Sequence, residues 1–113
     1  MDESGFVAVL VVDLHFPEAG SLKSKRKELS SIKAGLHTRL GATVAETEYH
    51  DLWQRARVTV ALTGRSATGL AAAVDRLERW LDSKCPDGVS VERIFASVED
   101  LRDFATPRLG REG

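Results

Sequence analysis

The chain has 113 residues, of which 42% are hydrophobic and 29% are charged, and its formal net charge is −1. These values are ordinary for a soluble globular protein and predict a single domain, residues 1–113, with one core. The near-neutral charge excludes binding of polyanions through bulk charge alone. The single cysteine, Cys85, excludes an internal disulfide and a cysteine-rich zinc site.

No apolar run in the chain is long enough to span a bilayer. The first residues, MDESG, are acidic and lack the basic region of a signal peptide. Low cysteine content fits a reducing compartment. The sequence therefore predicts a cytoplasmic protein that does not bind membranes, and it contains no strong signature of a cofactor or a metal.

Residues 6–16, FVAVLVVDLHF, form the longest apolar run and predict a central β-strand that ends at Pro17. Side chains alternate across a strand, so one wholly apolar set should face a layer of helices. The opposite set is apolar at first and then polar. It comprises Val7, Val9, Val11, Asp13 and His15.

Residues 22–40 predict a helix, because leucine and isoleucine recur at helical spacing between a capping Ser21 and a terminating Gly41. Residues 43–48 then predict an edge strand, with Val44, Glu46 and Glu48 on one face. A connector over residues 49–56 leads to a strand over residues 57–63, whose Val58, Val60 and Leu62 should face the helices.

Ser66 predicts the start of a second helix that ends near Ser83, and Pro86-Asp87-Gly88 predicts a turn before a strand over residues 89–96. Ser97 and Asp100 resemble a capping box for a short helix over residues 98–104. We expect the core to span about residues 6–96. Residues 97–113 form an extension that ends in a disordered tail after Pro107.

The element order β-α-β-β-α-β predicts an α+β, ferredoxin-like sandwich: a four-stranded antiparallel sheet with two helices on one face. The first and third strands should be central. The other sheet face would leave Val7, Val9 and Val11 exposed, which is more apolar surface than a monomer usually keeps in water. We expect a second copy, the C-terminal segment or a partner to cover it, with a homodimer as the favoured state.

The start of the first helix is strongly basic. Residues 21–40 contain six basic residues and one acidic residue, and four of the basic residues fall in the first two turns, where the helix dipole disfavours cations. An anion bound there would explain the pattern. A solvated polar face is the alternative interpretation. The candidate anion or RNA site comprises Lys23, Lys25, Arg26 and Lys27, with Arg55 and Arg57 added from the connector and the following strand.

The connector contains Trp53, which could stack on a base beside Arg55 and Arg57. A tryptophan in such a connector more often closes the end of a core, and this structural interpretation is favoured. A second cluster could bind a metal or catalyse acid–base chemistry if its members converge. It comprises Asp13, His15, Glu46, Glu48 and His50. Cys85 has no evident base nearby in the sequence that would activate it as a nucleophile.

Two strings, LHFPEAGSLKSKR at residues 14–26 and VAETEYHDLWQRA at residues 44–56, together with the strand that follows, resemble the YlxP-like family of small bacterial proteins. The resemblance covers about residues 6–96 and implies a ferredoxin-like fold. Members of this family of unknown function are often encoded beside translation and ribosome-maturation factors, which implies a role near RNA. The family brings no established catalytic residues, so none are transferred.

The sequence therefore favours a binding module for RNA or a ribosomal component that uses the basic helix start. The alternative is a homo-oligomeric adaptor whose interface is the open sheet face, without nucleic acid. An enzyme or small-ligand protein that uses Asp13 and His15 is the third hypothesis, and the sequence favours a non-enzymatic role over it.

Overall fold

The computed structural model describes residues 5–112, and their side chains up to residue 105. The expected fraying of residues 1–4 lies outside the described part. The elements are β1 (Phe6–His15), α1 (Leu22–Leu40), β2 (Thr43–Glu48), β3 (Arg55–Gly64), α2 (Ala67–Lys84), β4 (Val89–Ser97) and α3 (Val98–Glu112).

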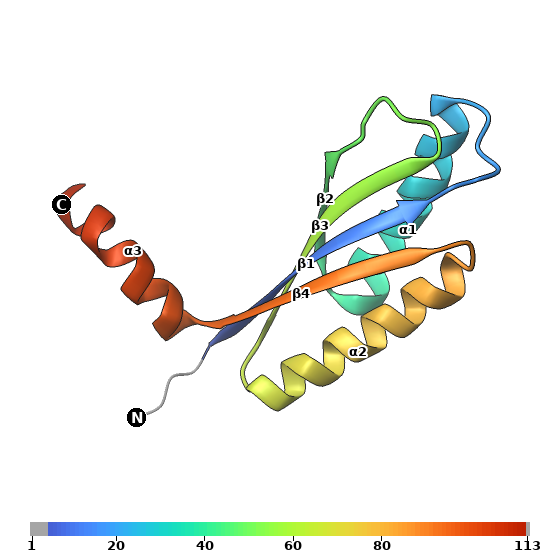
Figure 1. The fold of residues 1–113 in the computed structure, drawn as a ribbon. Coiled ribbons are helices and arrows are strands. Elements are labelled where there is room, and N and C mark those ends of the chain that lie inside the picture. Colours follow the sequence, from blue (N-terminus) through green and yellow to red (C-terminus); the bar gives the residue numbers. More distant parts are fainter. Residues whose placement is uncertain (1–4, 113) are drawn as a thin grey trace.

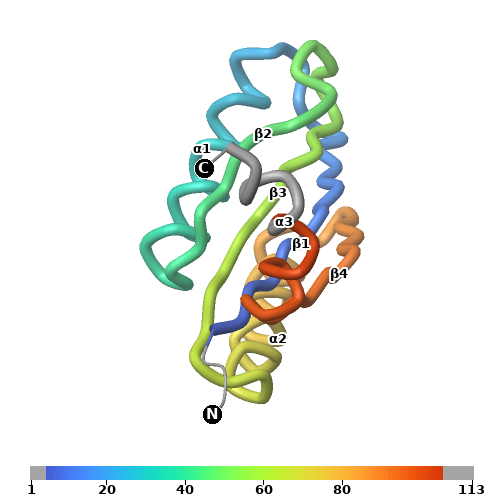
Figure 2. Tube along the Cα trace, turned by 90° about the vertical axis from the view of Figure 1, so that its left-hand side faces the viewer, coloured from blue at the N-terminus to red at the C-terminus, as the bar shows by residue number. Residues whose placement is uncertain are grey.

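The four strands form one antiparallel sheet in the order β2-β3-β1-β4, with α1 and α2 on one face (Figures 1 and 2). The predicted ferredoxin-like α+β fold is confirmed, as is the central position of the first and third strands. None of the helices in the described part of the chain is long and apolar enough to cross a membrane.

The core lies between the sheet and the two helices. Leu10, Leu14 and Val60 are almost wholly buried on the helix-covered face, as the alternation of β1 and β3 predicts. The side chain of Trp80 on α2 packs against Gly35 on α1 so closely that a Cβ atom at residue 35 would overlap its ring. The absence of a side chain at Gly35 therefore allows the two helices to approach each other.

Both main helices begin and end where the sequence predicts. The Ser21 Oγ accepts a hydrogen bond of 3.1 Å from the Ser24 amide, and the Ser66 Oγ accepts one of 3.0 Å from the Gly69 amide. Gly41 ends α1 with a φ of 68°, a left-handed conformation that glycine adopts without steric cost.

Two local details differ from the sequence prediction. β3 begins at Arg55 and not at residue 57. A register shift in β2 between Glu46 and Glu48 also separates these glutamates, which we expected on one face. Glu46 is paired with Val58 of the helix-covered face, whereas Glu48 is paired with Arg57 of the open face. A bulge of this kind depends on how two strands pair, so the sequence of β2 alone does not reveal it.

α3 extends away from the sheet as an arm (Figure 1). The predicted capping box is present, because the Asp100 amide donates to the Ser97 Oγ at 2.9 Å and the Ser97 amide donates to the Asp100 Oδ2 at 3.0 Å. The helix continues to Glu112, well past residue 104, where we expected it to end and the chain to become disordered soon afterwards. The arm contributes to a long molecule of 51 × 32 × 21 Å.

Candidate nucleic-acid interface

Three segments meet at the end of the molecule opposite the N-terminus: the loop after β1, the first turns of α1, and the connector between β2 and β3 (Figure 2). The Phe16 amide donates to the Gln54 carbonyl at 2.9 Å. The Gln54 Nε2 in turn donates to the carbonyls of Pro17 and Ala19 at 3.1 and 3.2 Å. These bonds hold the connector against the loop that leads into α1.

Lys25 is buried beneath this connector, with only 1% of its surface exposed. Its Nζ donates to the Tyr49 carbonyl at 2.6 Å and lies 3.1 Å from the Glu46 Oε2. Tyr49 has a φ of 68°, so the lysine also fixes a residue in the left-handed conformation. Our inclusion of Lys25 in a surface anion site is wrong, because the side chain is occupied inside the protein. Lys25 lies four residues before the buried Leu29, on the same side of α1, so the helical spacing could have predicted its burial.

The other three cations of the helix start, Lys23, Arg26 and Lys27, are exposed. Residues three and four positions apart are neighbours on a helix surface, so both Arg26 and Lys27 lie next to Lys23. The first turn of α1 contains no acidic residue that could neutralise them. These cations therefore form a local positive surface on a protein of near-neutral charge.

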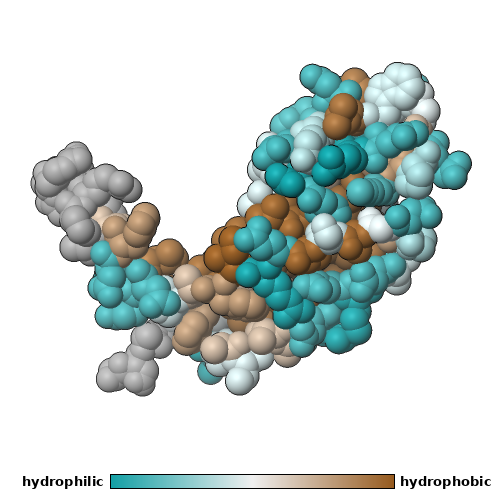
Figure 3. Space-filling view, viewed as in Figure 1, coloured by the Kyte–Doolittle hydropathy of each residue, from teal (hydrophilic) through white to brown (hydrophobic). Residues whose placement is uncertain are grey.

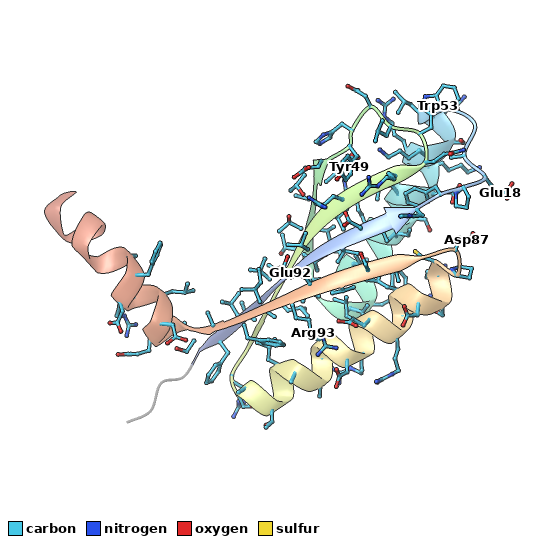
Figure 4. The ribbon with its side chains drawn as sticks, viewed as in Figure 1. Glu18, Tyr49, Trp53, Asp87, Glu92 and Arg93 are labelled. Carbon is cyan, nitrogen blue, oxygen red and sulfur yellow. The ribbon has the colours of Figure 1, made fainter. Side chains whose placement is uncertain are left out.

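Trp53 is 52% exposed at the tip of the connector, close to the start of α1 (Figure 4). It does not close the core, so the structural interpretation that we favoured for it is wrong. Its neighbour Leu52 is 46% exposed, and residues 51–55 line a shallow hollow. We call Lys23, Arg26, Lys27 and Trp53 the basic end.

Arg55 and Arg57 lie on the open sheet face, away from α1. Arg57 donates to both carboxylate oxygens of Asp13, at 2.8 and 3.1 Å, and to Glu48 at 3.2 Å. The hydrogen bond from Arg57 holds the pKa of Asp13 below its ordinary value. Arg57 is thus neutralised by its neighbours. Arg55 stacks 4.2 Å above the ring of Tyr49, and no acceptor bonds its buried Nε among the described residues.

The second predicted cluster does not converge. Asp13 is held by Arg57, Glu46 lies beside Lys25, and the His50 Nε2 is 3.1 Å from the Glu46 carbonyl. Within residues 5–105 no three histidine, cysteine or acidic side chains are placed to hold one metal ion. Burial raises the pKa of the Cys85 thiol, which disfavours the reactive thiolate.

The open sheet face is apolar over half of its length. Val7, Val9 and Val11 are partly exposed there, and Ile94 of β4 lies opposite Val9 with 46% of its surface exposed. Figure 3 shows this apolar surface along the middle of the sheet. α3 leaves this surface uncovered, because the arm projects away from it.

The fold and these surfaces define a small ferredoxin-like domain with an exposed basic end and an open sheet face. Residues 7–98 match the family described as protein of unknown function DUF503, and the chain belongs to that family. It is 30% identical over 66 residues to the uncharacterized protein YlxP of Bacillus subtilis, a match that covers 58% of this chain and 72% of that protein. The arm lies almost wholly beyond the family match.

Two solved structures share the fold. A de novo designed protein, Foldit4, matches with a TM-score of 0.54 and 13% identity over 82% of this chain and 97% of its own. An amidase of the hydantoinase/carbamoylase family from Burkholderia multivorans matches with a TM-score of 0.56 and 17% identity over 95% of this chain. This chain spans only 33% of that amidase, and both likenesses concern the fold alone.

Proposed function

We propose that this protein is an RNA-binding module that holds structured RNA, free or within a ribosomal particle, at the basic end. The observation that carries the proposal is an exposed Trp53 on the connector that Gln54 ties to the loop before α1, together with exposed cations in the first turns of that helix. RNA-binding proteins combine these two features, because cations bind the phosphates and an aromatic ring stacks on an unpaired base.

The amino end of α1 favours an anion as well. Backbone N–H groups at the start of a helix lack partners within the helix and carry partial positive charge. The Ser21 Oγ accepts a hydrogen bond from one of them, the Ser24 amide. Lys23, Arg26 and Lys27 add full charges at the same place. In the absence of an anion, this concentration of positive charge is unfavourable, so a bound phosphate would relieve it.

The connector would present its aromatic ring in a fixed position. Hydrogen bonds from Gln54 to the loop after β1, and from Lys25 to the Tyr49 carbonyl, tie both ends of the connector to the body of the protein. A stacking residue that is held in place loses little conformational entropy when it binds. Lys25 therefore supports the proposed site from beneath without touching RNA.

The test is a titration of the protein with ribosomal RNA at several salt concentrations. Lys23→Glu combined with Lys27→Glu should weaken binding sharply and reduce the salt slope by about one unit for each lost phosphate contact. The matched control is Arg76→Glu with Arg79→Glu, which makes the same charge change at exposed positions of α2. Equal loss in both variants, or unchanged binding in the first, would contradict the proposed site.

A further inference from the structure

α3 presents an apolar surface that its own domain does not cover. Val98, Leu101 and Phe104 are 40%, 46% and 78% exposed, and they recur at helical spacing on one side of the arm. Acidic residues occupy much of the other side. An amphipathic helix of this kind is stable when its apolar side packs against another surface.

The open sheet face is a second apolar surface without a cover. It and the apolar side of α3 face the same concave region between the sheet and the arm (Figure 3). α3 has 15 residues and is therefore about 22 Å long, whereas a strand of ten residues such as β1 is about 33 Å long. The arm would thus fit along a sheet face of this size.

The arm cannot reach its own sheet face without breaking the junction that connects them. β4 ends at Ser97 and α3 begins at Val98, so no linker residue separates them. The Val98 amide donates to the Gly5 carbonyl at 2.8 Å, and the capping box between Ser97 and Asp100 fixes the first turn. A Cβ atom at Gly5 would lie 2.7 Å from the Val98 Cγ2, which shows how closely the junction is packed.

We infer that two copies of this chain pair by exchanging arms, so that α3 of each copy lies on the open sheet face of the other. A two-fold dimer covers both surplus apolar surfaces at once, because each chain carries one arm and one face. The apolar side of the arm packs on the strip formed by Val7, Val9 and Ile94.

Three substitutions test the exchange, since Leu101 on the arm, Ile94 on the face and Leu52 on the connector share the same exposed fraction of 46%. In sedimentation of the full chain, the wild type should be a dimer. Leu101→Asp and Ile94→Asp should each shift the mass to monomer, whereas Leu52→Asp should remain dimeric. Thermal melts should show that all three variants are folded.

A mixture distinguishes exchanged arms from other dimers. Leu101→Asp retains an intact face and Ile94→Asp retains an intact arm, so an equimolar mixture can form one complete arm-on-face contact and should recover dimer. A dimer built from two faces or from two arms would gain nothing from mixing, and that result would overturn the inference. A monomeric wild type at high micromolar concentration would also overturn it.

A disulfide trap reports the contact directly. Cys85 is only 7% exposed, so cysteines introduced at exposed positions should be the ones that react. Phe104→Cys and Ile94→Cys, prepared separately, should form a mixed disulfide with each other faster than either forms one with itself. Placing both substitutions in one chain should give cross-linked dimers, and a cross-link within a single chain would show that the arm folds back.

Discussion

The two faces of the sheet differ in what covers them, although the same strands form both. The helix-covered face is apolar along the two central strands, β1 and β3, and is closed by α1 and α2. The open face is apolar at one end and ion-paired at the other, where Arg57 links Asp13 to Glu48. The first face therefore determines stability, whereas the second is available for contacts outside the domain.

The largest expected effect compares neighbouring residues of β1 that point to opposite faces. Leu10→Ala should lower the free energy of unfolding by about 3 kcal/mol, because it leaves a cavity in a closed core. Val60→Ala on the same face should act in the same direction.

Val9→Ala is the control for this comparison, since Val9 precedes Leu10 and lies on the open face. It should cost about 1 kcal/mol or less when the protein is dilute. Chemical denaturation measures both changes. An equal loss in the free energy of unfolding for Val9→Ala and Leu10→Ala would show that the two faces contribute equally to stability.

A second comparison concerns two lysines of α1: Lys25 is buried with polar partners, and Lys23 is exposed. Lys25→Met removes the charge beside Glu46 and the donor to the Tyr49 carbonyl, and we expect a loss of about 2 kcal/mol, because a charge and a carbonyl then lack partners. Lys23→Met should change stability by less than about 0.5 kcal/mol. Denaturation curves that ranked the two variants in the opposite order would contradict the structural role of Lys25.

The third comparison concerns the ion pair of the open face, whose expected contribution to stability is smaller than those of Leu10 and Lys25. The folded pKa of Asp13 lies below its ordinary value of 3.8, so the pair stabilises the protein above that pH. Its contribution is lost as the pH falls through the folded pKa. Asp13→Asn should cost about 1 kcal/mol at pH 7, a modest value because solvent screens this partly exposed pair.

The pH dependence supplies the check on that assignment. The difference in stability between wild type and Asp13→Asn should shrink from about pH 4 downward, as the carboxyl of the wild type becomes protonated. A difference that stayed constant from pH 7 to pH 2 would show that another property of Asp13 is responsible.

Much of the fold could be predicted from the sequence because its signals are local. The alternation in β1, the caps Ser21 and Gly41, and the Ser97–Asp100 box each specify an element through contacts within a few residues. The ferredoxin-like topology then follows from the element order.

The candidate site was predicted less well, because its residues depend on contacts between distant segments. Lys25 reaches a carbonyl 24 residues away, and the bulge that turns Glu48 toward Arg57 arises from pairing with another strand. Trp53 resembled a core residue by composition, yet the connector carries it outward. Of these residues, only Lys25 could have been placed correctly from the sequence, because its helical spacing from Leu29 predicts a buried position.

The most direct measurement of the proposed function is the fluorescence of Trp53 during titration with ribosomal RNA. Stacking of a base on the exposed indole should quench it, whereas Trp80, packed against Gly35, should change little. RNA should quench the fluorescence of the wild type, and this quenching should be lost in Trp53→Phe and weakened in the Lys23→Glu, Lys27→Glu variant. Equal quenching in the wild type and in Trp53→Phe, or binding without any quenching, would contradict an RNA contact at the basic end.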